Sequence, residues 1–183
     1  AKSAATDGTL RFHPARYAKS FEQWHDNIRD WCISRQLWWG HRIPVWSTVR
    51  ESAESARARL ARFIERDRVA VTGSADGATT YVCIRGDADT DAEAMLADPA
   101  LGYHRDSDVL DTWFSSALWP ISTMGWPNPD ERTKGLLEAF NPSSTLCTAR
   151  EIITLWVSRM VMFNRYFRGE GGGKGTLPFK DVF

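Results

Sequence analysis

The chain has 183 residues, with 23 Lys or Arg against 23 Asp or Glu. This length suffices for one domain with a sizeable core, or for one domain that carries a small insertion. The balanced charge excludes the global positive field of many nucleic-acid-binding proteins, so any contact with nucleic acid must come from a local patch.

Cysteine and histidine usage narrows the class further. The three cysteines, Cys32, Cys83 and Cys147, lie far apart and form no Cys-x-x-Cys pair, which argues against a disulfide framework or a zinc knuckle. The histidines show no spacing typical of a metal site. No apolar run reaches the about 18 residues that a membrane helix needs. We therefore expect a cytoplasmic protein without a bound metal or a membrane span.

The first part of the chain predicts a strand and a helix. Residues 9–12 are typical of a short strand. Ser20 is a candidate helix N-cap. Apolar side chains at helical spacing then predict a helix over residues 21–33 with one buried face. Residues 42–46, after an aromatic run, are expected to be extended.

Residues 47–106 differ in composition from their flanks, being rich in Ala, Arg, Asp and Thr. Residues 51–66 favour a helix. Residues 69–71 and 80–84 predict two strands joined by a glycine-containing, hairpin-like turn. Residues 91–97 predict a short helix. This block is expected to be an insertion with its own small α+β core.

The remaining stretch, 107–183, predicts a return to the scaffold formed by residues 1–46. A buried helix should lie between two strands, which gives a βαβ unit and therefore a parallel sheet. Glycines at 171–173 predict a turn before the last strand. The expected elements are a loop at 119–130, a helix at 131–140, a strand at 144–148, a helix at 150–168 and a strand near the end of the chain.

Three motifs follow one another along the chain. Residues 30–44 read DWCISRQLWWGHRIP, residues 108–116 read DVLDTWFSS, and residues 148–153 read TAREII and run on to Trp156. In this order they resemble the valyl-tRNA synthetases, a family of class I aminoacyl-tRNA synthetases. Isoleucyl and leucyl relatives share the Ser-Arg-Gln and Asp-Thr-Trp triplets, whereas the string LWWGHR is valyl-like.

The resemblance implies an α/β fold in which residues 1–46 and 107–183 form the second part of a Rossmann-like nucleotide-binding catalytic domain. Residues 47–106 would be its connective insertion. The whole enzyme would use ATP with Mg²⁺ to convert valine to valyl-adenylate and then charge tRNA(Val), in protein biosynthesis. The His-Ile-Gly-His and Lys-Met-Ser-Lys-Ser signatures are absent from the sequence. We therefore expect a central fragment that binds no cofactor alone, is inactive alone, and works with the remaining domains of the same polypeptide, an editing domain among them.

The resemblance also implies a valine pocket. It assigns Trp113, Ile152 and Trp156 to the apolar wall and Glu151 to the contact with the substrate's ammonium group. Ile152 and Trp156 lie four apart on the predicted helix and so should share one face, and Trp113 and Trp156 are expected to face one cavity. Each residue has a structural alternative: ordinary core for the apolar residues and stabilisation of the helix dipole for Glu151.

The segment expected next to the adenylate departs from the family pattern. The family usually shows Thr-Gly-Phe-Asp, whereas this chain has Thr148, Ala149, Arg150 and Glu151. Alanine adds a methyl group where close approach matters, and glutamate reaches one methylene further than aspartate. The sequence keeps the negative charge but leaves its contact open.

The first motif has two interpretations. Its arginines could bind phosphate while its indoles stack on bases. Alternatively, arginines beside tryptophans support the fold through cation–π pairs. The residues concerned are Arg35, Trp38, Trp39, His41 and Arg42. We expect no catalytic side chain, because chemistry of this type depends on positioning and on neutralising phosphate charge. An alternative interpretation of the whole chain, from a different functional class, is a non-catalytic nucleic-acid-binding or assembly module.

Overall fold

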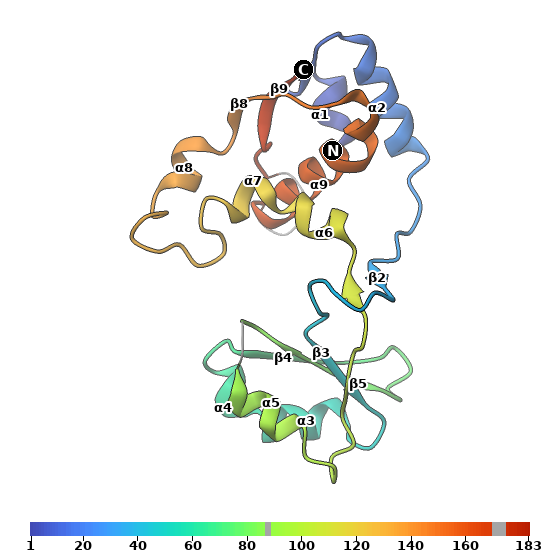
Figure 1. Ribbon diagram of the computed structural model, residues 1–183, viewed down its shortest axis with the longest axis vertical. Helices are drawn as coiled ribbons and strands as arrows, with labels where there is room; N and C mark the ends of the chain where they lie inside the picture. Colours follow the sequence, from blue (N-terminus) through green and yellow to red (C-terminus); the bar gives the residue numbers. More distant parts are fainter. Residues whose placement is uncertain (87–88, 170–174) are drawn as a thin grey trace. The chain divides into compact units, whose positions relative to one another are not determined.

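A computed structural model describes residues 1–86, 89–169 and 175–183. The described residues divide into two compact units, which we call unit 1 and unit 2 (Figure 1). Unit 1 consists of Ala1–Ile33 and Asp111–Phe183, and unit 2 of Ser34–Leu110. The predicted glycine turn at 171–173 lies outside the described residues. The fold is therefore described one unit at a time.

Unit 1 contains a small parallel sheet. Within the described residues its strand order is β1 (Arg11–Phe12), β9 (Phe179–Val182) and β8 (Ser143–Leu146). Val182 pairs with Phe12 on one side and with Leu146 on the other, and both ladders are parallel. The parallel pairing predicted for this part of the chain is confirmed, and the sheet as described is small.

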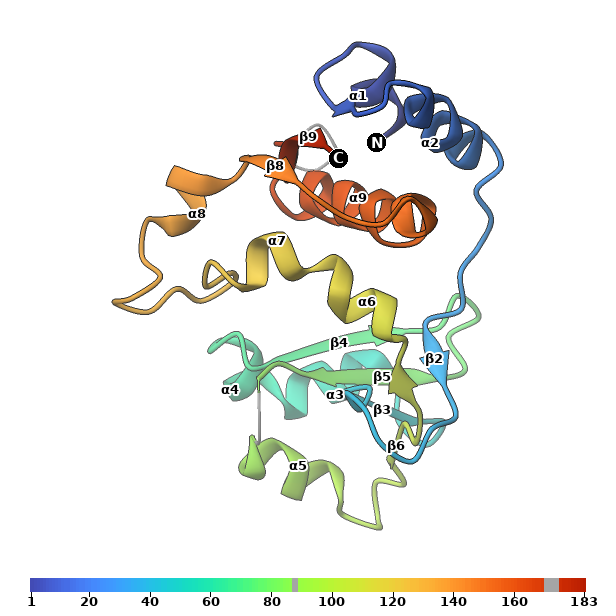
Figure 2. The same ribbon diagram turned by 45° about the horizontal axis from the view of Figure 1, so that its top comes forward.

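Helices cover this sheet and form the core of unit 1. They are α1 (Lys2–Thr6), α2 (Arg16–Asp26) and α9 (Ser158–Phe167), and Figure 2 shows α9 running alongside β8 and β9. Phe21 of α2 and Met160 of α9 are fully buried against strand residues such as Phe179.

The bounds of α2 correct the sequence prediction. Ser20 lies inside the helix instead of capping it, because the chain already turns after Pro14, whose carbonyl oxygen accepts the Tyr17 N–H at 3.1 Å. The helix ends at Asn27, whose side-chain amide donates to the carbonyl oxygen of Gln23 at 2.8 Å. Residues 27–33 are consequently not helical.

The prediction of one long helix over residues 150–168 is also wrong for the first half of that range. The chain forms a 3₁₀ turn, η1 (Arg150–Ile152), then a π-helical turn, η2 (Ile153–Val157), and only then α9. A wide π turn displaces carbonyl groups from their usual helical partners. The buried Arg159 side chain takes up two of them, because Nη1 donates to the Leu155 oxygen at 2.7 Å and to the Thr154 oxygen at 3.4 Å.

Three short helices connect the motifs of unit 1: α6 (Thr112–Ala117), α7 (Trp119–Ser122) and α8 (Leu136–Phe140). Helix α7 lies where we predicted only loop. The predicted helix at 131–140 is shortened to α8, because Gly135 precedes it with a positive φ of 82° that a helix interior does not allow.

A buried amide pair fixes the entry to β8 against α9. The Asn141 Nδ2 donates to Asn164 Oδ1 at 2.8 Å, and the Asn164 Nδ2 donates back to Asn141 Oδ1 at 3.1 Å. Asn164 also donates to the Thr176 carbonyl oxygen at 2.7 Å. Because buried amides are costly unless they are paired, this reciprocal arrangement specifies how these segments pack.

Unit 2 is built on an antiparallel sheet. In its described part the strand order is β4 (Val69–Gly73), β5 (Thr80–Ile84), β3 (Val45–Thr48) and β6 (His104–Arg105). The predicted hairpin is confirmed as β4 and β5. A separate antiparallel pair joins β2 (Ser34–Arg35) to β7 (Val109–Leu110).

Helices α3 (Ala53–Arg59), α4 (Ala61–Ile64) and α5 (Thr90–Leu96) complete unit 2. The single helix predicted over 51–66 is divided at Leu60 into α3 and α4, whereas α5 confirms the helix predicted over 91–97. Its core is an apolar cluster of its own, which holds Leu60, Phe63, Val69, Val82, Ile84, Ala92, Leu96 and Tyr103. Unit 2 therefore has the α+β composition that we predicted for the insertion.

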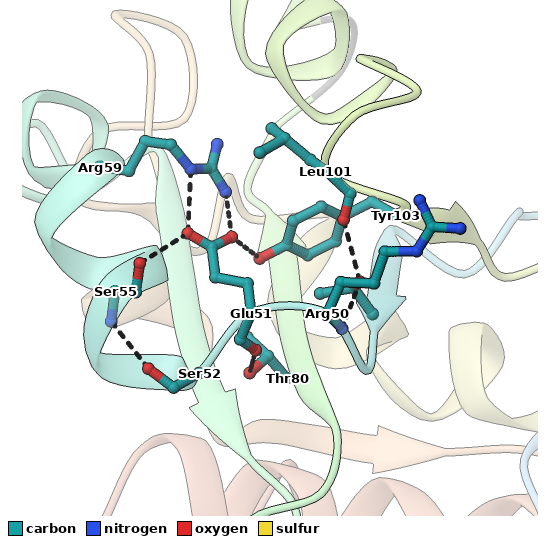
Figure 3. Close-up of polar contacts among 9 residues, drawn as sticks. Arg50, Glu51, Ser52, Ser55, Arg59, Thr80, Leu101 and Tyr103 are labelled. Carbon is teal, nitrogen blue, oxygen red and sulfur yellow. Dashed lines mark hydrogen bonds and ion pairs between the residues drawn. The ribbon is translucent and has the colours of Figure 1, made fainter.

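A polar cluster around Glu51 connects α3 to the segment before β6 (Figure 3). The carboxylate of Glu51 accepts from the Nε and the Nη2 of Arg59 and from the Tyr103 hydroxyl, the latter at 2.9 Å. The bonds from Arg59 hold the pKa of Glu51 below its ordinary value, whereas burial and the bond to Glu51 raise the pKa of Tyr103. These contacts occupy the Glu51 carboxylate and the Tyr103 hydroxyl and tie α3 to the segment before β6.

The compact units do not divide where we placed the domain boundaries. Unit 2 contains all of 47–106 and adds residues 34–46 and 107–110, which we had assigned to the catalytic domain. These additions are held by the β2–β7 pair. Compactness in space does not test where an insertion begins in the sequence, so the limits 47–106 stay a prediction.

Candidate functional site

The candidate site begins at the carboxyl edge of the parallel sheet in unit 1. The three strands end in register at Phe12, Val182 and Leu146. Just beyond them, the Thr148 N–H donates to the Phe183 carbonyl oxygen at 2.9 Å. Ligands of open parallel sheets bind beyond this edge. Thr148 and Ala149, which we expected near the adenylate, therefore lie at the edge where such a ligand would bind.

Two residues at this edge were missed by the sequence analysis. The His13 N–H donates to the Val182 carbonyl oxygen at 2.7 Å, and the His13 ring stacks on the Phe183 ring with centroids 4.3 Å apart. Each residue directly follows a strand, β1 or β9. That position, together with the aromatic ring, is the signal that could have identified them.

A charged group borders the same edge. Arg11 donates to both carboxylate oxygens of Asp181, at 2.8 and 2.6 Å, and the His13 Nε2 lies 2.9 Å from Oδ1. The Arg11 guanidinium, and after it His13, lower the pKa of Asp181 to about 2. Asp181 is therefore ionised and committed to its partners, which leaves it no role as a proton donor near neutral pH.

Glu151 lies one turn further along the chain. It is in η1, and its side chain is 68% exposed. Its carboxylate oxygen lies 3.3 Å from the Arg150 Nε, a contact between two solvent-exposed groups that holds little energy. The carboxylate is thus close to the carboxyl edge and open to solvent.

Trp113 and Trp156 come from two segments of unit 1 that pack against each other, α6 and η2. Trp156 is half-buried. Its Nε1 donates to the Ser116 carbonyl oxygen at 2.9 Å, and its ring centroid lies 5.9 Å from that of Trp119. Trp113 is half-buried in the first turn of α6. The shared cavity expected for Trp113 and Trp156 stays a prediction.

The reason we gave for grouping Ile152 with Trp156 is wrong. Ile152 belongs to the 3₁₀ turn η1 and Trp156 to the π turn η2, so their spacing of four does not align them as it would on a regular α-helix. Both remain partly exposed and close to the carboxyl edge in sequence. Their assignment to one pocket now depends on the family resemblance.

Asp111 positions the start of α6. Its buried carboxylate accepts the Trp113 N–H at 2.7 Å and the Trp31 indole N–H at 3.3 Å. The guanidinium of Arg159 lies over the Trp31 ring, 4.2 Å from its centroid. Burial lowers the pKa of Arg159, and the charge of Asp111 opposes that shift. Asp111 is therefore the N-cap of α6.

The other predicted residues lie in unit 2, on the loop that follows β2. Trp38 is 97% and Trp39 79% exposed, so neither indole packs into the core of the described chain. The Arg35 Nη1 donates to the Ser34 carbonyl oxygen at 2.8 Å, and the backbone of Arg42 forms a bridge with Val109. His41 is exposed on the same loop.

The part of the chain that the structure describes holds neither a metal-binding cluster nor a membrane-spanning helix. Over residues 1–86, 89–169 and 175–183 there is no group of three or more His, Cys, Asp or Glu side chains that could hold a metal ion. The same residues contain no helix with the length and apolar character needed to cross a membrane.

Comparison with known proteins gives a match over almost the whole chain. Residues 2–183 match the family described as tRNA synthetases class I (I, L, M and V). The chain is 42% identical over 196 residues to the valine–tRNA ligase of Rhodopirellula baltica, which covers 100% of this chain and 18% of that protein. For the valine–tRNA ligase of Bdellovibrio bacteriovorus the identity is 40% over 183 residues, with 100% and 16% covered. The chain thus spans less than a fifth of the length of these relatives.

Proposed function

Since this chain belongs to the class I tRNA synthetases of the isoleucine, leucine, methionine and valine group, we propose that it is part of the catalytic domain of a valine–tRNA ligase. The observation that carries the proposal is the similarity at about 40% identity, along the full chain, to relatives named valine–tRNA ligases. The valyl-like string at residues 37–42 favours valine over isoleucine or leucine.

The proposed reaction joins valine to tRNA(Val) through valyl-adenylate. ATP with Mg²⁺ is the second substrate of the whole enzyme; it would supply the adenylyl group that joins the valine carboxylate, with pyrophosphate as the leaving group. We assign the phosphates to other parts of the polypeptide, those that carry the two nucleotide signatures. This chain contributes the amino-acid side of the site, in the cytoplasm and with the remaining domains of the same polypeptide.

Trp113, Ile152 and Trp156 are proposed to enclose the valine side chain. A rigid indole suits this task, because it offers a flat apolar face and loses little conformational entropy on binding. An apolar pocket of this kind cannot strongly reject threonine, in which a hydroxyl replaces one methyl group. The proposal therefore requires a separate editing domain elsewhere in the polypeptide.

Glu151 is proposed to meet the ammonium group of valine. Its support is its place beyond the carboxyl edge and its exposed carboxylate, which only Arg150 engages in the contacts described above. Thr148 and Ala149 would lie beside the adenylate, with the Thr148 backbone held by Phe183. The additional methyl group of Ala149 would make this approach tighter than the glycine usual in the family.

The proposal is tested on the polypeptide encoded by the complete reading frame that contains these residues. We expect pyrophosphate exchange that depends on valine, with isoleucine and leucine far weaker, and charging of tRNA(Val). The purified 183-residue chain should show no exchange. Exchange with isoleucine or leucine in preference to valine would identify one of those relatives instead. A complete polypeptide that activates no amino acid would favour the rival, a non-catalytic nucleic-acid-binding or assembly module.

A further inference from the structure

The loop between β2 and β3 in unit 2 exposes two adjacent indoles. Trp38 and Trp39 are 97% and 79% exposed, and their neighbour Leu37 is 57% exposed. Large aromatic side chains contribute most to stability when they are buried. A pair held in solvent therefore contributes little to the stability of the described chain, and contiguous exposed apolar groups mark sites of interaction.

The loop is held firmly at its base. Gln36 donates to the Asp108 carboxylate at 2.7 Å, and the Leu110 N–H donates to the His41 carbonyl oxygen at 2.7 Å. Gly40 lies so close to Val109 that an added Cβ would be 3.0 Å from its Cγ2. Residues 107–110 thus fix both ends of the loop, and the indoles are preorganised on it.

Two hollows meet at Arg42. One, of about 390 Å³, is lined by Trp38, Trp39, Gly40 and Arg42 among others. The other, of about 510 Å³, is lined by Arg42, Trp46, Glu93 and Arg105 among others. Arg42 belongs to both linings and its side chain is exposed. A ligand that extends from the indoles would therefore reach this guanidinium next.

The charges favour an anionic ligand. No carboxylate lines the first hollow among the described residues, so Arg42 carries the only formal charge there. In the second hollow, Glu93 is already paired with Arg105, whose Nη1 donates to it at 2.9 Å. A protein surface that covered Arg42 without supplying an anion would leave a buried unpaired charge, which is costly. Phosphate supplies that anion.

We propose that Trp38, Trp39 and Arg42 form a binding site for single-stranded RNA, in which bases stack on the indoles and a phosphate binds Arg42. Stacking on aromatic faces beside guanidinium groups is how proteins bind unpaired strands with little sequence preference. The inference rests on the proposed function, which makes tRNA the partner, and it assigns this loop to an unpaired segment of that RNA.

The test uses the 183-residue chain and a fluorescein-labelled single-stranded RNA of about eight nucleotides. Fluorescence anisotropy measures the dissociation constant. We expect Trp38→Ala and Trp39→Ala each to weaken binding by at least about fivefold, whereas Trp38→Phe and Trp39→Phe retain most of it because a stacking face remains. The logarithm of the binding constant falls linearly with the logarithm of the salt concentration. Arg42→Gln should make this slope shallower by about the amount that one phosphate contact contributes.

Matched controls come from the same unit. Tyr81→Ala removes an exposed aromatic ring from β5, and Arg66→Gln removes an exposed guanidinium after α4. Neither residue lines the two hollows. Both variants should bind the RNA as the parent chain does. Circular dichroism of every variant checks that the fold is kept.

Three results would overturn the proposal. The alanine variants could bind the RNA as tightly as the parent. Duplex RNA and inorganic polyphosphate could compete as well as single-stranded RNA, which would show a purely electrostatic contact. The chain could instead bind no RNA and self-associate through the two indoles, which would make them a protein interface. Valine activation by the complete polypeptide is measured separately, so its failure removes the proposed function without changing the RNA result.

Discussion

Trp156 donates its indole N–H to the Ser116 carbonyl oxygen, at 2.9 Å. The acceptor lies in the last turn of α6. The donor lies in the π turn η2, so this turn is tied to α6, the helix whose first turn holds Trp113. The bond fixes the plane of the indole, which also packs against Trp119 and the core of unit 1.

The valine-pocket proposal predicts unequal effects of two substitutions in the complete polypeptide. Trp156→Ala should lower kcat/KM for valine activation by about 2–4 kcal/mol in transition-state terms. Trp156→Phe keeps an aromatic face and loses the bond to Ser116, so it should cost only about 1 kcal/mol. Pyrophosphate exchange measures both. Tyr166→Ala, at an exposed position of α9, is the control. Equal, small effects of the two substitutions would count against a pocket at Trp156.

The buried amide pair predicts a stability effect within unit 1. Asn164→Ala removes the reciprocal bonds to Asn141 and the bond to the Thr176 carbonyl oxygen. Among the described residues, the buried Asn141 amide then keeps only its contacts with the Pro120 carbonyl oxygen and the Thr176 hydroxyl. The expected loss is about 2–3 kcal/mol in the free energy of unfolding. Urea unfolding of the 183-residue chain measures it. Asn128→Ala, at an exposed loop position, should change nothing, and an Asn164 variant as stable as this control would contradict the prediction.

His25 predicts a dependence of stability on pH. Burial, and after it the charge of the N-terminal amino group, lowers its pKa from 6.5 to about 4. Because the folded pKa is below the unfolded one, the unfolded state takes up the proton first. Stability should therefore fall as the pH drops from about 6.5 towards about 4. Unfolding is compared at about pH 7 and about pH 5.5, where most carboxyl groups stay ionised. The His25→Gln variant separates His25 from the N-terminal amino group, whose pKa burial also lowers. His25→Gln should flatten the change, and an unaltered slope would reject His25 as its source.

Local patterns were enough to predict much of unit 2. The β4–β5 hairpin follows from two short apolar strands around a glycine-containing turn, and α5 from its sequence alone. The strand at β8 and the parallel pairing with β9 followed from a βαβ pattern. In each case the information lies within neighbouring residues.

The wrong or missing predictions depend on particular side-chain contacts that periodicity along the chain does not contain. The π turn at 153–157 is stabilised by Arg159, a position that helical periodicity assigned only to the helix. The stacking of His13 on Phe183 joins residues 170 positions apart, and no local pattern contains it. Likewise the sequence alone left Trp38 and Trp39 open between core and surface, because exposure depends on whether another segment covers them.

The division into units predicts which excised segment should fold. Ser34 and Arg35 pair with Leu110 and Val109, so residues 34–110 contain every strand of the two sheets of unit 2 as described. A segment 47–106 would lose the β2–β7 pair and also Val45 and Trp46, half of β3, which lies between β5 and β6. We therefore expect residues 34–110 to unfold cooperatively in urea and 47–106 to do so weakly or not at all. If 47–106 proved as cooperative as 34–110, β2 and β7 would belong to the scaffold, as the composition of the sequence suggested.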